Sequence, residues 1–403
     1  TNSYEYYIFP NSKDVAALPN QDPHNPVTLD KIKLGQLLFH ETGLAQNASQ
    51  EMSLETYSCA SCHISSAGFT PGRMQGIADG GLGYGENREL WQAYDETEID
   101  AQGLRPLTIL NVGYMTNTLW GGLFGATGVN IGTEDVWDNN ALTEVNHLGF
   151  EGLESQNIEG LDLHRMAITD KVLDEYGYRA YFDKCFPELP VEERYSVKAA
   201  SFALGAYLRN VLANEAPFQK YLKGDLKALT ERQKKGALIF MGKARCTVCH
   251  NSPSFSNMEF HVMGTQDLYH QSQALNTSES DARNLGRGLF TGKEEDYYAF
   301  KVPQLYNVGD YTHFFHGSSK QSVREVVEFK IKAISENPNV ADDQLSPYFK
   351  PLNLTPQEVD DLVDFLENGL RDPHLDRYVP ETVLSGNCFP NNDPFSVFQT
   401  GCN

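Results

Sequence analysis

Two short motifs of cysteine and histidine carry the residues best suited to chemistry in this sequence. They are Cys59-Ala60-Ser61-Cys62-His63 and Cys246-Thr247-Val248-Cys249-His250. Two thiols at this spacing can reach both vinyl groups of a haem while the next histidine meets the iron. A zinc site, which takes four protein ligands, and a redox dithiol are the alternatives, but each motif stands in its own separate surroundings. The motifs therefore predict two covalently bound c-type haems, with His63 and His250 as proximal ligands.

The sequence ahead of one motif is repeated ahead of the other. Residues 31–39 and 232–240 both have the pattern of an amphipathic helix, with a glycine and a phenylalanine at matching positions. Thr28 and Thr230 are the expected N-caps of these helices. A match of this kind predicts that one haem-binding unit has been duplicated.

The repeat continues downstream of each motif. Leu110-Asn111-Val112-Gly113 returns as Tyr306-Asn307-Val308-Gly309, and a ring residue follows nine positions after each Asn. That residue is Trp120 in the first unit and His316 in the second. We expect Trp120 to lie between the haems, with an ordinary core position as the alternative. Each unit is expected to end in a helix, over residues 197–211 and 355–370, the second starting at a capping box with Pro356 in its first turn.

The predicted fold is mostly α-helical, with two cytochrome c-like domains that each bind one covalent c-type haem. A chain of 403 residues exceeds what one hydrophobic core usually organises. The expected divisions are an N-terminal extension over 1–26, haem domains over 27–222 and 223–385, and a C-terminal tail over 386–403. Cys388 and Cys402 are expected to close that tail with a disulfide, whereas Cys185 should be a buried free thiol.

Composition limits the partners and the location. A formal net charge of −22 excludes a nucleic-acid partner and favours a basic or neutral protein. No uninterrupted apolar run is long enough for a membrane span. Because the sequence opens with polar Thr1-Asn2-Ser3, we expect a periplasmic protein whose signal peptide has been removed.

The two irons are expected to differ in their sixth ligand. No histidine occurs between His63 and His147, and the other candidates for the first iron are Tyr84 in the glycine-rich loop, Met74 and Met115. We therefore expect a five-coordinate first iron that binds hydrogen peroxide, whereas an iron with two protein ligands is suited to electron transfer.

A lysine marks the second site. The segment 322–335 is expected to be a helix whose apolar face contains Val323, Val326, Val327 and Ile334, and Lys330 interrupts that face. Such a lysine either extends to water or is kept neutral by burial and binds a metal, and the pattern alone favours water. The remaining candidates for this position are Met258, Met263 and His270.

From residue 27 to 371 the chain resembles the bacterial di-haem cytochrome c peroxidase family, which includes the MauG-type protein-modifying oxidases. The two five-residue Cys-x-x-Cys-His motifs are called the pentads below. Besides them, the resemblance rests on an ordered series of motifs at 68–73, 119–120, 255–261, 285–287, 300–303 and 314–318. The resemblance implies further cofactor-binding residues beside Cys59, Cys62, Cys246, Cys249 and the proximal histidines. These are Arg73, His261, Arg287 and His316.

The same resemblance implies a role for each haem. The first performs peroxide chemistry, the second stores or delivers an electron, and Trp120 is the bridge. Many family peroxidases close the first haem with a histidine from the glycine-rich loop, and its absence here implies a constitutively open site. Counting from His316 puts the family's sixth ligand of the second haem at Lys330, which reverses the preference for water.

The resemblance also implies an acid/base over the open iron, because peroxide cleavage requires a proton to move from one oxygen to the other. His164 best matches its position and Glu159 is the second choice, while a surface helix with incidental charge is the alternative. Arg165 is expected to stabilise peroxide or to bind a haem propionate. Calcium between the haems is a further possibility, although Arg105 replaces an Asn ligand of the family.

Two departures from the family leave the substrate open. Gly121-Gly122 replaces the common Asp-Gly-Arg after Trp120, and residues 124–150 look like an insertion at the entrance to the first haem. The leading hypothesis is a peroxidase that takes electrons from a small cytochrome or cupredoxin. The alternatives are MauG-like oxidation of aromatic residues in a partner protein and a non-catalytic electron-transfer cytochrome. The sequence leaves open whether the protein forms a homodimer.

Overall fold

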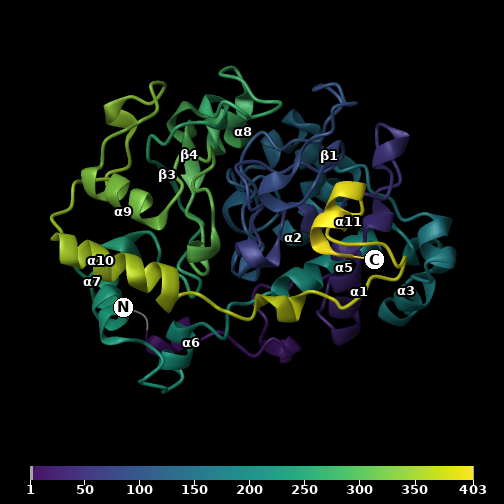
Figure 1. The fold of residues 1–403 in the computed structure, drawn as a ribbon, viewed down its shortest axis with the longest axis horizontal. Coiled ribbons are helices and arrows are strands. Elements are labelled where there is room, and N and C mark those ends of the chain that lie inside the picture. The colour runs from purple at the N-terminus through teal and green to yellow at the C-terminus, as the bar shows by residue number, and fades with distance from the viewer. Residues whose placement is uncertain (1–2, 403) are drawn as a thin grey trace.

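The structure, a computed structural model, describes residues 3–402 and consists of two helical lobes side by side (Figure 1). The first lobe contains α1 (Leu29–His40), α2 (Gly152–Leu163), α3 (Arg179–Cys185), α4 (Val191–Arg194) and α5 (Val197–Asn210). The second contains α6 (Pro217–Leu222), α7 (Glu231–Met241), α8 (Arg287–Thr291), α9 (Val323–Lys332) and α10 (Pro356–Asp364). The mostly helical fold is confirmed.

The strands within the described residues are short. β1 (Gly81–Leu82) pairs antiparallel with β2 (Glu89–Leu90) in the first lobe. In the second lobe, β3 (Phe260–Val262) pairs antiparallel with β4 (Ala299–Lys301), with His261 opposite Phe300. The helices and the loops that they support therefore position the functional residues.

The predicted N-caps are confirmed. Thr28 Oγ1 accepts a hydrogen bond from the Lys31 amide at 3.2 Å, and Thr230 Oγ1 accepts one from the Gln233 amide at 3.2 Å. At the start of α10, the Thr355 hydroxyl accepts a hydrogen bond from the backbone amide of Glu358. The Glu358 side chain in return accepts one from the backbone amide of Thr355. These side chains satisfy amide groups that have no partner within the first turn of a helix.

The same helix crossing occurs in both lobes. α1 packs on α5 in the first lobe, and α7 packs on α10 in the second. A Cβ atom at Gly35 would collide with the carbonyl of Ala203, and one at Gly236 would collide with the carbonyl of Asp361. Glycine at the matching position therefore allows each pair of backbones to approach closely, as a duplicated unit requires.

One predicted helix is shorter than expected. The segment expected to be helical over 322–335 forms α9, which ends at Lys332, because Ala333 takes the left-handed conformation at φ +50°. Ile334 then lies outside the helix and is 67% exposed, so its predicted place on the apolar face is wrong. Lys330 stays within the last turn of the helix.

The N-terminal segment and α6 both contact the second lobe. Near the N-terminus, the Phe9 ring packs against Tyr306 of the second lobe at 4.9 Å between centroids. Phe218 of α6 packs against Phe255 at 5.6 Å. α6 therefore packs with the second lobe, and the division of the units at residue 222 stays a prediction.

The C-terminal tail crosses back to the first lobe and ends in α11 (Pro394–Thr400) (Figure 1). The predicted disulfide joins Cys388 to Cys402, and Cys185 is a buried free thiol. Within the first lobe, the tail carboxylate of Asp393 forms a fully buried ion pair with Arg88 at 3.4 Å. The carbonyl of Pro390 in the tail accepts hydrogen bonds from the hydroxyls of Ser58 and Ser61 at 2.8 and 3.1 Å, so the tail is part of the wall around the first pentad.

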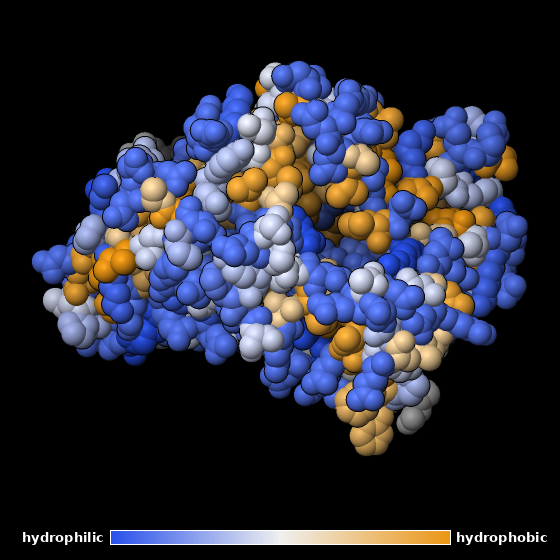
Figure 2. Space-filling model, turned by 90° about the horizontal axis from the view of Figure 1, so that it is seen from above, coloured by the Kyte–Doolittle hydropathy of each residue, from blue (hydrophilic) through white to orange (hydrophobic). Residues whose placement is uncertain are grey.

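Most of the face seen from above is hydrophilic, with hydrophobic residues gathered around a hollow near its middle (Figure 2). Among the described residues, no helix is both long and apolar enough to cross a membrane.

Candidate haem-binding sites

Both proximal histidines are held in the same way. A single turn of 3-10 helix contains the first cysteine of each pentad, over Cys59–Ser61 and Cys246–Val248. His63 Nδ1 lies 3.1 Å from the carbonyl oxygen of Phe69, and His250 Nδ1 lies 2.7 Å from that of Phe255. With Nδ1 as the donor to a carbonyl, Nε2 of each ring keeps its lone pair for a metal.

Burial keeps both rings neutral. It lowers the pKa of His63 to about 4 and that of His250 to about 4, against smaller opposing effects of the carbonyl hydrogen bonds. A histidine must be deprotonated at the nitrogen that binds a metal. Each ring is therefore ready to serve as an axial ligand at neutral pH.

The remaining parts of the pentads also fit covalently attached haem. Cys59, Cys62, Cys246 and Cys249 are all free thiols. Among residues 3–402, Arg73 Nε is buried and has no hydrogen-bond partner, which is costly unless an acceptor occupies the adjacent space. A haem propionate would be such an acceptor. The residues present therefore fit the group that the pentads imply.

A three-residue cluster beside the second pentad reopens the zinc alternative. Cys249, Glu259 and His261 place one ligand atom each within 4.8 Å of one another. His261 Nε2 lies 3.4 Å from Cys249 Sγ, and its Nδ1 lies 3.1 Å from the Ser346 hydroxyl. Zinc sites usually take four protein ligands or three with a water. Because Cys249 also belongs to a complete pentad, haem attachment accounts better for this thiol.

His164 is held next to the first proximal site. It follows α2 directly, its Nδ1 lies 2.6 Å from Asp100 Oδ2, and its carbonyl accepts a hydrogen bond from the Tyr57 hydroxyl at 3.0 Å. Burial lowers the pKa of His164, but the charge and hydrogen bond of Asp100 outweigh it, so the net shift is upward. Because Tyr57 stands two positions before Cys59, this hydrogen bond ties the backbone of His164 to the first pentad.

The two other predicted distal residues face different partners. Arg165 Nη1 binds Asp79 and also donates to the Glu98 carbonyl at 2.7 Å, so its guanidinium is already paired. Burial raises the pKa of Glu159, with further contributions from the charges of Asp162 and Glu144. Asp100 and Asp79 were missed by sequence reasoning, because nothing in their local sequence distinguishes them from the many other acidic residues of the chain.

Lys330 points into the second site rather than to water. Its Nζ lies 3.3 Å from Met263 Sδ and 5.7 Å from the ring centre of Phe349. Burial lowers the pKa of Lys330 to about 8, against the opposing charges of Cys249 and Cys246. Its own charge acts on His250. Of the other candidate ligands, Met263 is brought to this place, whereas His270 is exposed and packs on Tyr269 at 4.2 Å between centroids.

A column of rings lies between the two units. Phe300 stacks on His316 with 3.7 Å between centroids, and Trp120 meets both rings edge-on at 6.2 and 6.3 Å. Trp120 Nε1 donates to the Arg105 carbonyl at 2.7 Å, and His316 Nε2 lies 2.8 Å from Asp267 Oδ1. The structure thus brings together the two ring residues that the sequence repeat singled out.

The two units exchange backbone hydrogen bonds at this column. The Lys301 amide donates to the Trp120 carbonyl at 2.9 Å, and the Arg105 amide donates to the His316 carbonyl at 2.8 Å. Arg105 and Lys301 each stand six positions before the repeated Asn, at Asn111 and Asn307. That shared offset is the signal that could have found them.

Two arginines have roles that the sequence did not show. Arg287 Nη1 donates to the Gly121 carbonyl at 3.0 Å and to Asn130 Oδ1 at 2.9 Å, so it braces the loop after Trp120. Arg105 is buried, and burial lowers its pKa to about 10, which leaves it charged at neutral pH. A fixed positive charge at the position of the family's calcium ligand disfavours a divalent cation there.

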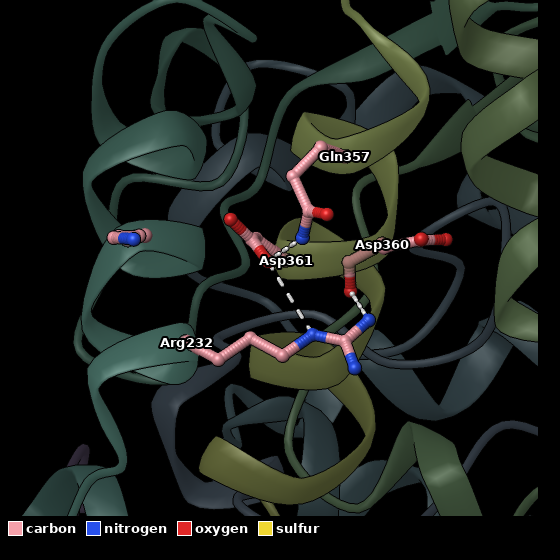
Figure 3. Close-up of a pocket in the computed structure, with 5 residues that line it drawn as sticks. Arg232, Gln357, Asp360 and Asp361 are labelled. Carbon is pink, nitrogen blue, oxygen red and sulfur yellow. Dashed lines mark hydrogen bonds and ion pairs between the residues drawn. The ribbon is translucent and has the colours of Figure 1, made fainter.

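A surface crevice of about 290 Å³ lies between α7 and α10 (Figure 3). Arg232 crosses it, with Nε 3.3 Å from Asp361 Oδ1 and Nη2 3.0 Å from the Asp360 carbonyl. Gln357 donates to Asp361 at 2.7 Å. Because its polar groups bind one another, the crevice supports the helix crossing and is no candidate site.

Comparison with known proteins gives consistent matches. A family model described as di-haem cytochrome c peroxidase matches residues 29–227. The chain is 26% identical over 374 residues to the methylamine utilization protein MauG of Methylorubrum extorquens, covering 90% of this chain and 86% of that protein. It is 26% identical over 364 residues to cytochrome-c peroxidase IdrP1 of a Pseudomonas species, covering 85% and 81%.

Among solved structures, a MauG-like protein associated with microbial copper homeostasis matches with a TM-score of 0.62. The identity is 22%, and the match covers 90% of this chain and 95% of that chain. At this level of identity the match shows a shared fold.

Proposed function

The chain belongs to the di-haem cytochrome c peroxidase family of oxidoreductases, and from that premise we propose that it activates hydrogen peroxide at a haem held by His63. Electrons are exchanged through a second haem held by His250. Cys59 and Cys62 attach the first haem, and Cys246 and Cys249 attach the second. When bound, the two haems supply redox-active iron, one centre for reaction with peroxide and one for electron transfer.

The contrast between the distal sides of the two units carries this proposal. For the first unit, the proposal is supported by the imidazole of His164, which is held by the carboxylate of Asp100 as a general acid/base would be. For the second unit, it is supported by an amine and a thioether, which are ligands for iron. The first unit is thus equipped to move protons and the second to complete a coordination sphere.

His164 is the proposed acid/base of the first unit. Asp100 fixes its Nδ1, so Nε2 is left to take a proton from one peroxide oxygen and return it to the other. The raised pKa keeps the imidazolium accessible near neutral pH, so that the same ring can donate the proton it has accepted.

Trp120 is the proposed route between the units. Its indole N–H is held by the Arg105 carbonyl, and its backbone carbonyl is held by Lys301 from the other unit. Changing Trp120→Phe should slow electron transfer between the haems, measured by rapid mixing, whereas Trp137→Phe should not. Trp137 is also buried but lies in a separate hydrophobic cluster with Leu123, Phe124, Val145 and Phe290. Equal rates in both variants would remove the bridging role.

The proposed electron donor is a small redox protein with a basic or neutral surface, such as a cytochrome c or a cupredoxin, because this chain carries a formal charge of −22. We place the protein in the periplasm. Oxidation of aromatic residues in a partner protein is the second candidate activity. This second activity is supported by the 26% identity to MauG, which extends over most of both chains.

The deciding experiment uses the protein with both haems attached. A resting EPR spectrum should contain one high-spin and one low-spin ferric signal, and mixing with peroxide should change the optical spectrum within one turnover. Two low-spin signals and no reaction with peroxide would favour a pure electron-transfer cytochrome, with His164 as a direct iron ligand. Assays with a small cytochrome, a cupredoxin and a tyrosine-containing protein would then separate the two activities.

A further inference from the structure

The second unit contains a pair of side chains that a single axial position does not account for. Lys330 Nζ and Met263 Sδ lie 3.3 Å apart, and both side chains are half-buried. Lys330 comes from the last turn of α9, and Met263 follows β3 directly. Two potential iron ligands from different elements therefore meet at one point.

A clamp between the two segments holds Met263 in place. The carbonyl of Gly264 accepts hydrogen bonds from the amides of Glu336 at 2.7 Å and Asn337 at 2.9 Å. Gly264 has φ +65°, and a Cβ there would collide with Ser335. The turn after Met263 is thus tied to the segment that follows α9, so the distance between Met263 and Lys330 is set by backbone contacts.

The pair faces the second pentad. Cys249 Sγ lies 3.4 Å from Nε2 of His261, which stands two positions before Met263. Asn337 also donates to the Thr265 carbonyl at 3.2 Å, which continues the clamp past Gly264. Both side chains therefore lie in the part of the second unit that contains the second pentad.

The two ligands differ in the oxidation state of iron that they prefer. An amine is a hard donor that favours ferric iron, whereas a thioether is a soft donor that favours the electron-rich ferrous state and raises the reduction potential. We propose that Met263 is a second axial ligand of the haem held by His250, and that it replaces Lys330 when this haem is reduced. The inference rests on the proposed haem site at His250.

The exchange takes up one electron and one proton. One electron from a one-electron donor protein reduces the iron, the bond from iron to Lys330 Nζ breaks, and a bond from iron to Met263 Sδ forms. The released amine takes one proton from solvent. When the electron leaves toward the first unit, the reverse exchange returns the proton. The incoming electron would thereby be held at a higher potential than the one at which it entered.

The test is spectroscopic and does not need peroxide. In the protein with both haems, magnetic circular dichroism and EPR of the ferric form should show an amine ligand at the low-spin haem. After reduction by dithionite, resonance Raman and optical spectra should show a thioether ligand. Voltammetry should give reduction and oxidation peaks that separate further as the scan rate rises, as exchange of ligands requires.

Three variants complete the test. Met263→Leu should keep the amine in both states, lower the potential and abolish the scan-rate dependence. Lys330→Ala should show the thioether in both states. Met241→Leu is the matched control, because Met241 is 42% exposed on α7, and it should behave as the unchanged protein.

An unchanged ferrous spectrum and potential in Met263→Leu would overturn the exchange, as would a thioether already bound in the ferric protein. These readings are separate from the proposed peroxide reaction. A protein that ignores peroxide but changes ligand on reduction would refute the peroxidase proposal alone.

Discussion

The two units of this molecule share their proximal halves and differ in their distal halves. In both, a glycine allows a close helix crossing, and a phenylalanine carbonyl orients the histidine of the pentad. Elsewhere in the units, the first has His164 bound to Asp100 and the second has Lys330 beside Met263. The two units thus share the way in which the histidine is oriented and differ in the polar side chains that could act beside it.

The interface between the units shows the same division. Arg105 and Lys301 occupy equivalent positions, and each donates its amide to the ring residue of the other unit. The ring residues themselves have diverged to Trp120 and His316. A symmetric backbone frame therefore presents an asymmetric pair of side chains, and the tryptophan, which is the more readily oxidised ring, belongs to the first unit.

The two units should differ most clearly when the haem-attaching cysteines of one unit at a time are replaced. Cys59→Ser with Cys62→Ser should remove half of the haem per chain and abolish the peroxide reaction. Cys246→Ser with Cys249→Ser should lose the same amount of haem, yet keep the first reaction with peroxide and lose sustained turnover. Haem content is measured as the pyridine haemochrome. A peroxide reaction that survives the first change would reverse the assignment of the units.

The distal acid/base is the next test of asymmetry. His164→Gln should slow the reaction with peroxide by roughly two to four orders of magnitude, because proton transfer between the oxygens loses its carrier. Glu159→Gln should change the rate only a few-fold, since His164, which is held by Asp100, is the proposed carrier of the proton. Stopped-flow rates at fixed haem content give the comparison. The opposite ranking would move the role to Glu159.

The shared helix crossing should respond equally in the two lobes. Gly35→Ala and Gly236→Ala should each lower the free energy of unfolding by about 1–3 kcal/mol, because the added methyl group overpacks the contact. Gly160→Ala is the control within α2, where an added Cβ meets nothing within 4 Å, and it should stabilise by up to about 1 kcal/mol. Urea unfolding measures all three. A cost in only one lobe would argue against equivalent crossings.

The smallest expected effect is a shift in pH dependence. The base form of His164 must be neutral, so the rate should rise with pH through its raised pKa. Asp100→Asn removes the charge that raises this pKa, so the rise should move to lower pH. Asp138→Asn, which removes the partner of the exposed His147 at 2.7 Å, should leave the profile in place. A profile unmoved in Asp100→Asn would separate His164 from the rate-limiting proton transfer.

Local sequence determined much of this molecule. The spacing within each pentad indicates the attached cofactor and the proximal ligand, because both depend on residues at most four positions apart. The caps at Thr28 and Thr230 and the disulfide of the tail were predicted for the same reason, since each joins residues close in the chain. The repeat also pointed to Trp120 and His316 as an equivalent pair.

The partners of the other site residues depend on contacts between distant parts of the chain. His164 and Asp100 are 64 positions apart, and Lys330 and Met263 are 67 positions apart. The contact between Arg105 and His316 joins different units. Such pairs form because packing of the helices brings separate loops together. The helical period and the capping patterns of the sequence carry no information about which loops meet. The cysteines and histidine of each pentad can therefore be predicted from neighbouring residues, whereas the partners of His164 and Lys330 depend on how the whole chain folds.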